Sequence, residues 1–215
     1  MRFSQIKKTY SAIISLGNSC TPAAQLRRHK LRTFSAPFDW VVSHSLSDIC
    51  NLFSKRFKDY MKFQNLQVIK GSSVYVDNEI VQPVKSYFIK DCLYNIISVH
   101  DFPVLPNQHW SHNYTAVKVK VNRRVNRLLY VLENSDSLLF IRWKATQKEA
   151  LELRSVLSQL TKGEIHILVL NPVNNIDKIN LLDWGLENIC ALKVPNQPEN
   201  DQWWDHIFSG ITLKA

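Results

Sequence analysis

The sequence predicts an α/β fold with a mainly parallel sheet covered by helices on both faces, a three-layer, Rossmann-like arrangement. Short apolar runs rich in β-branched residues recur along the chain, and stretches with helical periodicity lie between them. The apolar runs do not alternate with polar residues, which is typical of strands buried on both faces of a parallel sheet. Strands and helices that alternate in this way form a sheet with helices on each side.

The first half of the chain begins with an expected strand in "YSAIISLG", which Gly17 ends. Thr21 as N-cap and Pro22 in the first turn predict a helix from about Pro22 to His29. Ser45 and Asp48 form a capping box ahead of a second helix.

The middle of the chain contains "YNIISVHDF", which predicts a second buried strand ending at His100. Before it, patches of alternation such as "SVYVDNEIV" predict a small inserted β-rich segment around residues 68–90. After it, the prolines and polar residues of "PVLPNQHWSHN" predict a loop.

In the second half of the chain, predicted helices and strands alternate more regularly. Residues 114–134 carry an apolar stripe at helical spacing, and Thr146 with Glu149 forms a capping box for a further helix. Strands are expected in "SLLFIRW", "EIHILVLN" and "NICALKVP", and a last short helix in "QWWDHIF". No repeat or linker divides the chain, so residues 1–215 are expected to form a single domain.

Composition narrows the class of protein. With 45% hydrophobic and 21% charged residues, the chain has globular composition. The apolar run "AIISL" is shorter than the roughly 7 to 15 residues of a secretory signal, so a cytoplasmic protein is expected. The four cysteines are far apart without a CxxC pair, which favours free thiols over a disulfide framework or a zinc site. No cofactor and no metal is expected.

The net charge of +9 favours anionic partners. Much of the charge lies in two clusters, which are expected to be solvated helix faces: Arg27, Arg28, Lys30 and Arg32, then Lys118, Lys120, Arg123, Arg124 and Arg127. Neither cluster contains an aromatic stacking platform, so nucleic acid is not an expected partner. Binding through the second cluster stays open as an alternative that salt dependence would test.

Cys20 is the candidate nucleophile. It lies where the first strand passes into a helix, and ligands of open α/β sheets bind at this edge. The unsatisfied N–H groups at a helix start favour a thiolate, so a lowered thiol pKa is expected. The backbone N–H groups of Ser19 and Cys20, or the Asn18 amide, are the candidate oxyanion donors.

His100 is the candidate base, because it is also expected at the carboxyl end of a strand and so at the same edge. Asp101 is the first candidate for a carboxylate that orients the imidazole. Adjacent side chains on a strand point apart, however, and Asp39 is a rival for this role. Trp40 and Arg142 are the candidate substrate-binding residues, Arg142 because it is expected at the end of a strand on this edge.

Several blocks of the chain resemble a bacterial family of unknown function that carries the label of papain-like cysteine peptidases. The likeness runs from about Ser11 to Asn171, with the blocks in the same order. The matching positions are Gly17 and Cys20, Pro-Phe-Asp-Trp at residues 37–40, His-Asp-Phe at residues 100–102, and Arg123, Arg124 and Arg142. The resemblance implies a Cys20 nucleophile with a His100 base.

Two departures keep alternatives open. The run around Cys20, "GNSCTP", does not match the glycine-serine-cysteine-tryptophan signature of papain-like enzymes, and papain-like enzymes have an antiparallel sheet. The predicted element order is closer to esterases of the Gly-Asp-Ser class, with Ser19 at their serine. Their closing Asp-x-x-His has no clean counterpart in Asp201, Asp205 and His206.

The leading hypothesis is a cysteine-dependent, peptidase-like hydrolase or acyl transferase that uses Cys20 and His100. Its expected partner is a peptide or a small substrate carrying an acyl group or a sugar. The second hypothesis is a non-catalytic module that binds an anionic carbohydrate or nucleotide. His109 and His112 as a metal pair, and Trp110 as a stacking platform, are further options.

Overall fold

The computed structural model describes residues 1–77 and 80–214, and in them strands form three sheets. A five-stranded sheet has the order β2-β7-β8-β10-β9, a four-stranded sheet the order β3-β6-β5-β4, and β1 pairs with β11. The α/β class is therefore confirmed. The expectation of one mainly parallel sheet is correct for the first of these sheets and wrong for residues 41–103.

The five-stranded sheet is parallel in four of its strands, and its bounds are β2 Ala12–Ser15, β7 Ser137–Trp143, β8 Glu164–Val173 and β10 Ile189–Pro195. The edge strand β9, Asn180–Leu182, runs antiparallel to β10. Four of the five apolar runs predicted as strands form this sheet, because both of its faces are buried and no polar alternation is needed.

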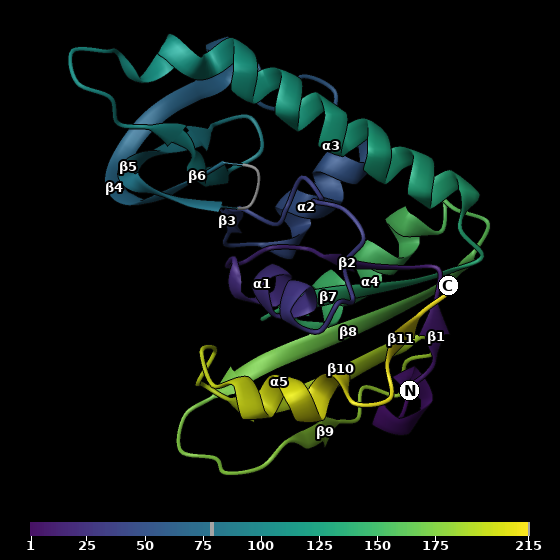
Figure 1. Ribbon diagram of the computed structural model, residues 1–215. Coiled ribbons are helices and arrows are strands. Elements are labelled where there is room, and N and C mark those ends of the chain that lie inside the picture. Colours follow the sequence, from purple (N-terminus) through teal and green to yellow (C-terminus); the bar gives the residue numbers. More distant parts are fainter. Residues whose placement is uncertain (78–79, 215) are drawn as a thin grey trace.

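Helices cover both faces of the five-stranded sheet (Figure 1). On one face lie α2, Leu46–Ser54, and α4, Gln147–Leu157, whose apolar side chains pack with those of alternate residues in β7 and β8. On the other face lie α1, Thr21–Arg28, and α5, Asp201–Phe208. The prediction of helices on each side of this sheet is confirmed.

The four-stranded sheet is wholly antiparallel: β3 is Val41–Ser43, β4 Leu66–Asp77, β5 Ile80–Asp91 and β6 Ile96–Pro103. The segment predicted around residues 68–90 forms the long β4–β5 hairpin, with Asn78 and Glu79 outside the described residues. The strand β6 was expected in the parallel sheet and to end at His100. It pairs instead with β3 and β5 and continues to Pro103, because a strand buried on both faces has the same apolar composition in either sheet.

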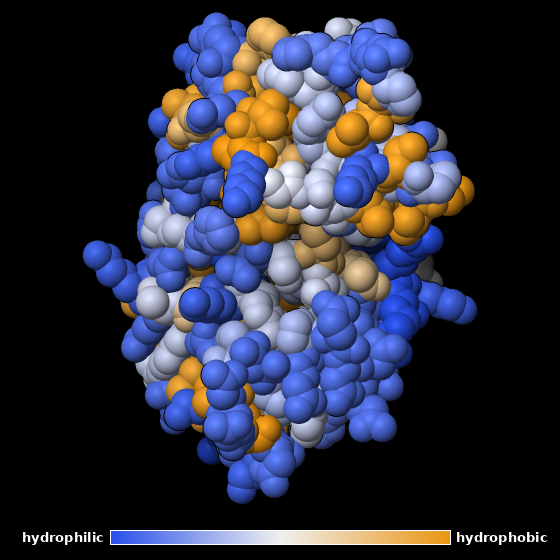
Figure 2. Space-filling model, turned by 90° about the vertical axis from the view of Figure 1, so that its left-hand side faces the viewer, coloured by the Kyte–Doolittle hydropathy of each residue, from blue (hydrophilic) through white to orange (hydrophobic). Residues whose placement is uncertain are grey.

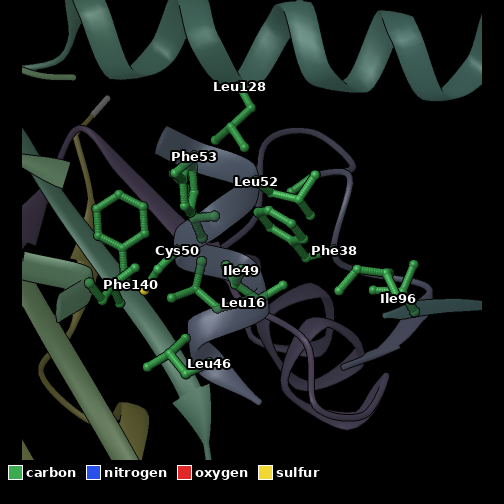
Figure 3. Close-up of a cluster of buried hydrophobic side chains, with 14 of the residues drawn as sticks. Leu16, Phe38, Leu46, Ile49, Cys50, Leu52, Phe53, Ile96, Leu128 and Phe140 are labelled. Atoms are coloured by element: carbon green, nitrogen blue, oxygen red, sulfur yellow. The ribbon is translucent and has the colours of Figure 1, made fainter. Parts of the chain in front are cut away.

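The longest helix, α3 (Tyr114–Asn134), lies over α2 and beside the four-stranded sheet (Figure 1). In Figure 3, Leu128 of this helix points down toward Leu52 and Phe53 of α2, with Phe38 beside them. This cluster joins the two larger sheets into one continuous core. At the chain ends, β1 (Thr9–Tyr10) pairs with β11 (Thr212–Leu213), and short 3-10 turns lie at Phe3–Ile6, Phe63–Asn65 and Trp110–Asn113.

Local sequence signals account for the starts of α2 and α4. In α1 the prediction of Thr21 as N-cap is wrong, because the helix begins at Thr21 and Cys20 takes the N-cap position without a side-chain cap. Thr146 Oγ1 accepts from the Glu149 backbone N–H, and the Glu149 carboxylate accepts from the Thr146 N–H, which completes the predicted capping box. At the start of α2, Ser45 Oγ accepts from Ser47 N, so Ser45 is the N-cap as expected, but the capping box predicted with Asp48 does not form. Within residues 1–77 and 80–214, no helix is both long and apolar enough to cross a membrane.

Candidate active site

The turn between β2 and α1 places Cys20. Gly17 and Asn18 both have φ of +75°, a left-handed conformation that glycine and asparagine adopt most readily. A Cβ at Gly17 would lie 3.1 Å from Ser43 Oγ, so the turn packs tightly on β3. Cys20 is the residue directly before α1 and has helical φ and ψ, with Pro22 in the first turn.

The buried side chain of Arg142 contacts the ends of both strands that flank this turn. Its side chain is fully buried and donates to Leu16 O at 2.9 Å, to Ser43 Oγ at 2.7 Å and to Ser43 O at 2.8 Å. A further bond reaches Lys144 O at 3.2 Å. Arg142 therefore ties the end of β2 to the end of β3, and its guanidinium is occupied by three backbone carbonyls and the Ser43 hydroxyl. Its predicted contact with a substrate stays a prediction.

Asn18 is also turned toward Ser43. Its backbone N–H donates to Ser43 Oγ at 3.1 Å, and its side-chain amide to Ser43 O at 3.5 Å. One N–H of the Asn18 amide is thus directed at Ser43 O, and its predicted role as an oxyanion donor stays a prediction. The N–H groups of Ser19 and Cys20, by contrast, have no hydrogen-bond partner among the described residues.

Cys20 is the partly exposed cysteine of the site, whereas Cys50 and Cys190 are buried in the core and Cys92 is exposed on the surface. Burial, followed by the nearby charges of Asp101 and Asp39, raises the pKa of the Cys20 thiol to about 12. The expectation of a lowered pKa is therefore wrong. At neutral pH the thiol is protonated, so any nucleophilic role requires a base.

His100 lies in β6, within an irregularity of its pairing with β5. Its Nδ1 lies 2.7 Å from Val74 O, and because a carbonyl can only accept, Nδ1 carries the proton. Ser73 Oγ lies 3.4 Å from the same nitrogen. The other ring nitrogen, Nε2, is then the basic one, and it has no hydrogen-bond partner in the part of the chain that the structure describes.

Asp101 points away from His100 into the protein. Its carboxylate accepts from Ser98 Oγ at 2.9 Å and is paired with Lys120 at 2.9 Å and Arg124 at 3.4 Å. Burial alone would raise the pKa of Asp101, but Arg124 and Lys120 hold it below its ordinary value. Adjacent side chains on a strand point to opposite sides, and Asp101 accordingly makes no hydrogen bond with the His100 ring. The Val74 carbonyl accepts the Nδ1–H of His100 in its place.

Asp39 is fully buried beside the same segment. One carboxylate oxygen accepts from Arg32 at 2.6 Å and from Ala36 N at 2.9 Å, while Oδ1 has no hydrogen-bond partner among the described residues. Burial raises the pKa of Asp39 to about 6, even though Arg32 opposes this shift. No hydrogen bond joins it to His100 in the described chain, so Asp39 does not orient the imidazole either.

Trp40 forms a wall beside the imidazole. Its ring meets the His100 ring edge-on with 5.7 Å between centroids, and the Arg32 guanidinium lies 5.6 Å from its centre. Trp40 is only 9% exposed. It therefore packs against His100 and leaves little area for direct contact with a substrate.

The segment 38–43 brings the two halves of the candidate site together. Gly17 and Asn18 pack on Phe38, Val41 and Ser43, while His100 packs on Trp40 of the same segment. The Cys20 thiol lies near enough to Asp101 and Asp39 to be affected by their charges. Among the described residues, no hydrogen bond joins Cys20 Sγ to His100.

The basic clusters are only partly solvated. Arg32, Lys120 and Arg124 turn inward to Asp39 and Asp101, and Arg28 pairs with Asp201 and Asp205 of α5. The expectation of solvated helix faces is therefore wrong for Arg32, Lys120 and Arg124, whereas Arg28 is exposed as expected. Asp39 and Asp101 are the buried carboxylates that these cations neutralise. Sequence spacing could not predict these ion pairs, because the partners lie on different elements.

The other predicted candidates lie elsewhere. Trp110 stacks on Phe63 at 5.6 Å, and His109 bonds Ser111. The His206 ring contacts Phe3, with 6.1 Å between centroids. A cavity of about 630 Å³ opens at the opposite end of the five-stranded sheet, near Glu164 and His166. The described residues contain no group of three or more side chains suited to a metal.

Comparison with known proteins places the chain in a family. The sequence model of the family described as "Putative papain-like cysteine peptidase (DUF1796)" matches residues 11–171. The chain belongs to this family. A member of the curated proteins, the uncharacterized protein R408 of Acanthamoeba polyphaga mimivirus, is 30% identical over 174 residues, which are 75% of this chain and 78% of that protein. No solved structure matches.

Family membership agrees with the resemblance drawn from the sequence blocks, over the same residues. The relative is viral, so the expected restriction to bacteria is not supported. The structure also accounts for two arginines of the shared blocks: Arg142 holds the turn before Cys20, and Arg124 pairs with Asp101. Sequence reasoning missed Ser43 and the Val74 carbonyl, and no sequence signal marks a backbone carbonyl as a histidine partner.

Proposed function

We propose that this member of the papain-like family is a cysteine-dependent hydrolase of the peptidase type, with Cys20 as nucleophile and His100 as base. The observation that carries the proposal is the state of His100. Its Nδ1–H donates to Val74 O, so Nε2 is the nitrogen that can accept a proton. The imidazole packs on Trp40, and the turn that carries Cys20 packs on the same segment 38–43. Membership of a family described as cysteine peptidases supports a cysteine-dependent hydrolase at the level of the reaction class.

The thiol proton is the first step that the proposal must explain. A Cys20 pKa near 12 means that a neutral thiol, and not a preformed thiolate, meets the substrate. His100 Nε2 takes this proton as Cys20 Sγ attacks the substrate carbonyl carbon. No hydrogen bond links the two residues in the described chain, so the proposal requires them to come within hydrogen-bond reach during the reaction.

The following steps use the same groups. The carbonyl oxygen becomes an oxyanion, for which the Ser19 and Cys20 N–H groups are the available donors. The bond from carbon to the leaving nitrogen then breaks, and His100 returns the proton to that nitrogen, which leaves a thioester on Cys20. Water attacks the thioester with His100 as base, the carbon–sulfur bond breaks, and a carboxylic acid and the free thiol result.

The test uses peptidyl vinyl sulfones, whose electrophile forms a covalent adduct with a cysteine that a neighbouring base activates. We expect mass spectrometry to locate the adduct on Cys20. His100→Ala removes the base and abolishes the adduct, whereas His112→Ala, a change of an exposed histidine in a surface turn, leaves it unchanged.

Two results would contradict the proposal. Adducts that form at Cys20 equally well without His100 would remove the imidazole from the mechanism. Labelling confined to the exposed Cys92 would show that accessibility alone governs reactivity.

A further inference from the structure

The outer strand of the four-stranded sheet has an unpaired edge. Strand β4 runs over Leu66–Asp77 and pairs with β5 on one side only, and no strand of the described chain pairs with its other side. A strand edge of this kind presents backbone N–H and C=O groups that can pair with another extended chain. Such edges are a typical place for strand addition. On β4 the Val74 carbonyl already accepts from His100 Nδ1, so an added chain pairs with the backbone groups of the other edge residues.

Exposed apolar side chains lie on the same hairpin. Val68, Val74, Ile80 and Val81 are 38% to 63% exposed. In Figure 2, which looks onto this side of the molecule, hydrophobic side chains gather in the upper half, at the height of the β4–β5 hairpin in Figure 1. Exposed apolar groups gathered in this way mark interaction sites more often than scattered ones do.

The exposed charges of the hairpin are mainly positive. Lys70 and Lys85 are exposed, Lys90 is half-buried, and none of the three has an ion-pair partner in the described chain. Lys85 lies directly opposite Val74 across the hairpin. An occupant that fits this surface must therefore supply apolar side chains together with negative charge.

The edge strand also reaches the proposed base. Val74 O accepts from His100 Nδ1 at 2.7 Å, and Ser73 Oγ lies 3.4 Å from the same atom. A chain added along β4 therefore passes close to the segment that orients the imidazole. An influence of the bound chain on His100 would rest on the proposed function, whereas docking along β4 does not.

We propose that the outer edge of β4 is a docking site for an extended, acidic polypeptide segment with alternating apolar residues. The site binds it by strand addition, with Val68 and Val74 in contact with its apolar side chains and Lys70 and Lys85 with its carboxylates. Docking needs no chemistry at Cys20, so it is separate from the hydrolysis proposed above.

Other occupants fit the surface less well. A second copy would bring its own Lys70 and Lys85 against the same lysines, in a chain with a net charge of +9. Nucleic acid would satisfy the lysines but not the apolar side chains or the backbone groups of the strand edge. An anionic lipid surface would leave those backbone groups unpaired.

The experiment uses the full chain with Cys20→Ala, which cannot form a thioester. The probe is an acetylated and amidated peptide of alternating glutamate and valine, and the control peptide has lysine in place of glutamate. We expect binding of the acidic peptide alone, measured by fluorescence anisotropy. Hydrogen exchange should show protection of backbone amides in residues 66–77.

Matched variants assign the binding to this surface. Lys70→Glu with Lys85→Glu should weaken binding by roughly tenfold or more. Lys162→Glu with Lys178→Glu, two exposed lysines elsewhere, changes the net charge equally and should leave binding within about twofold. Equal losses in both variants, protection outside β4, no binding, or binding to anionic vesicles but not to the peptide would each overturn the proposal.

Discussion

Ser43 is the residue on which the geometry of the candidate nucleophile depends. Its Oγ accepts from both Arg142 and Asn18, and its carbonyl accepts from the Arg142 guanidinium. A single hydroxyl thus links a buried charge to a turn with two left-handed residues. Arg142 thereby fixes how this turn packs on β3, through the Ser43 hydroxyl that it shares with Asn18.

Replacement of Arg142 by Met should therefore cost more than an ordinary core change. The variant leaves the Leu16 carbonyl buried without a donor and the Ser43 carbonyl with only the 3.5 Å contact from Asn18, and we expect a loss of about 3 kcal/mol in the free energy of unfolding. Urea denaturation measures it. Arg142→Lys retains a donor and should recover part of the loss, and a Met variant as stable as the wild type would contradict this role.

Asp39 gives the site a dependence on pH. Burial raises its pKa from 3.8 to about 6, so the folded protein holds the Asp39 proton more tightly than the unfolded chain does. The stability that Asp39 contributes is then complete below about pH 4 and is lost as the pH rises through about 6.

We therefore expect the wild type to lose stability relative to Asp39→Asn between about pH 4 and pH 7, by on the order of 3 kcal/mol. Asparagine does not titrate at this position. The variant lacks the ion pair with Arg32, which lowers its stability by an amount that does not depend on the ionisation of residue 39. Unfolding free energies of both proteins across this range test the sign. A difference that grows in favour of the wild type with rising pH would contradict the burial effect.

At the scale of elements, the helices and the parallel pairing of β2, β7, β8 and β10 were predictable, whereas the partners of β6 were not. The helix predicted over residues 114–134 is confirmed as α3, and the capping box predicted Thr146 at the start of α4. These signals act between residues a few positions apart. Strand β6 carries no such local mark of its partners, because apolar composition indicates burial but not whether a neighbour is parallel.

The cap of α4 offers a local test. Thr146→Ala removes the oxygen that accepts from Glu149 N and should lower the free energy of unfolding by about 1 kcal/mol. Thr146→Ser keeps that oxygen and should stay close to the wild type. Thermal or urea unfolding gives both values, and equal losses in the two variants would mean that the threonine methyl, and not the cap, stabilises this end.

At the scale of the whole molecule, the segments outside the family match complete the fold. Trp204, Ile207 and Phe208 of α5 cover the face of the five-stranded sheet that Leu139 and Leu168 present. Strand β10, Ile189–Pro195, pairs with β8. The matched residues 11–171 contain neither element.

A fragment of residues 11–171 should therefore fail to form a stable fold. Without α5 and β10 it exposes one apolar face of the sheet, and buried apolar area is the dominant stabilising contribution. We expect poor dispersion in its amide spectrum and no cooperative thermal transition, in contrast to the full chain. A fragment with native-like dispersion would show that residues 172–215 are dispensable.

The sequence by itself determined the α/β class, the main helices and their caps, and the candidate pair of Cys20 and His100. These follow from periodicity, from short-range hydrogen bonds and from motifs that stand together along the chain. Only the tertiary structure decided that His100 lies in an antiparallel sheet, that Val74 orients it, and that Arg142 and Asp101 are buried among other partners. Those facts depend on contacts between residues far apart in the sequence, and the free energy of such contacts is set by burial and geometry that no local pattern encodes.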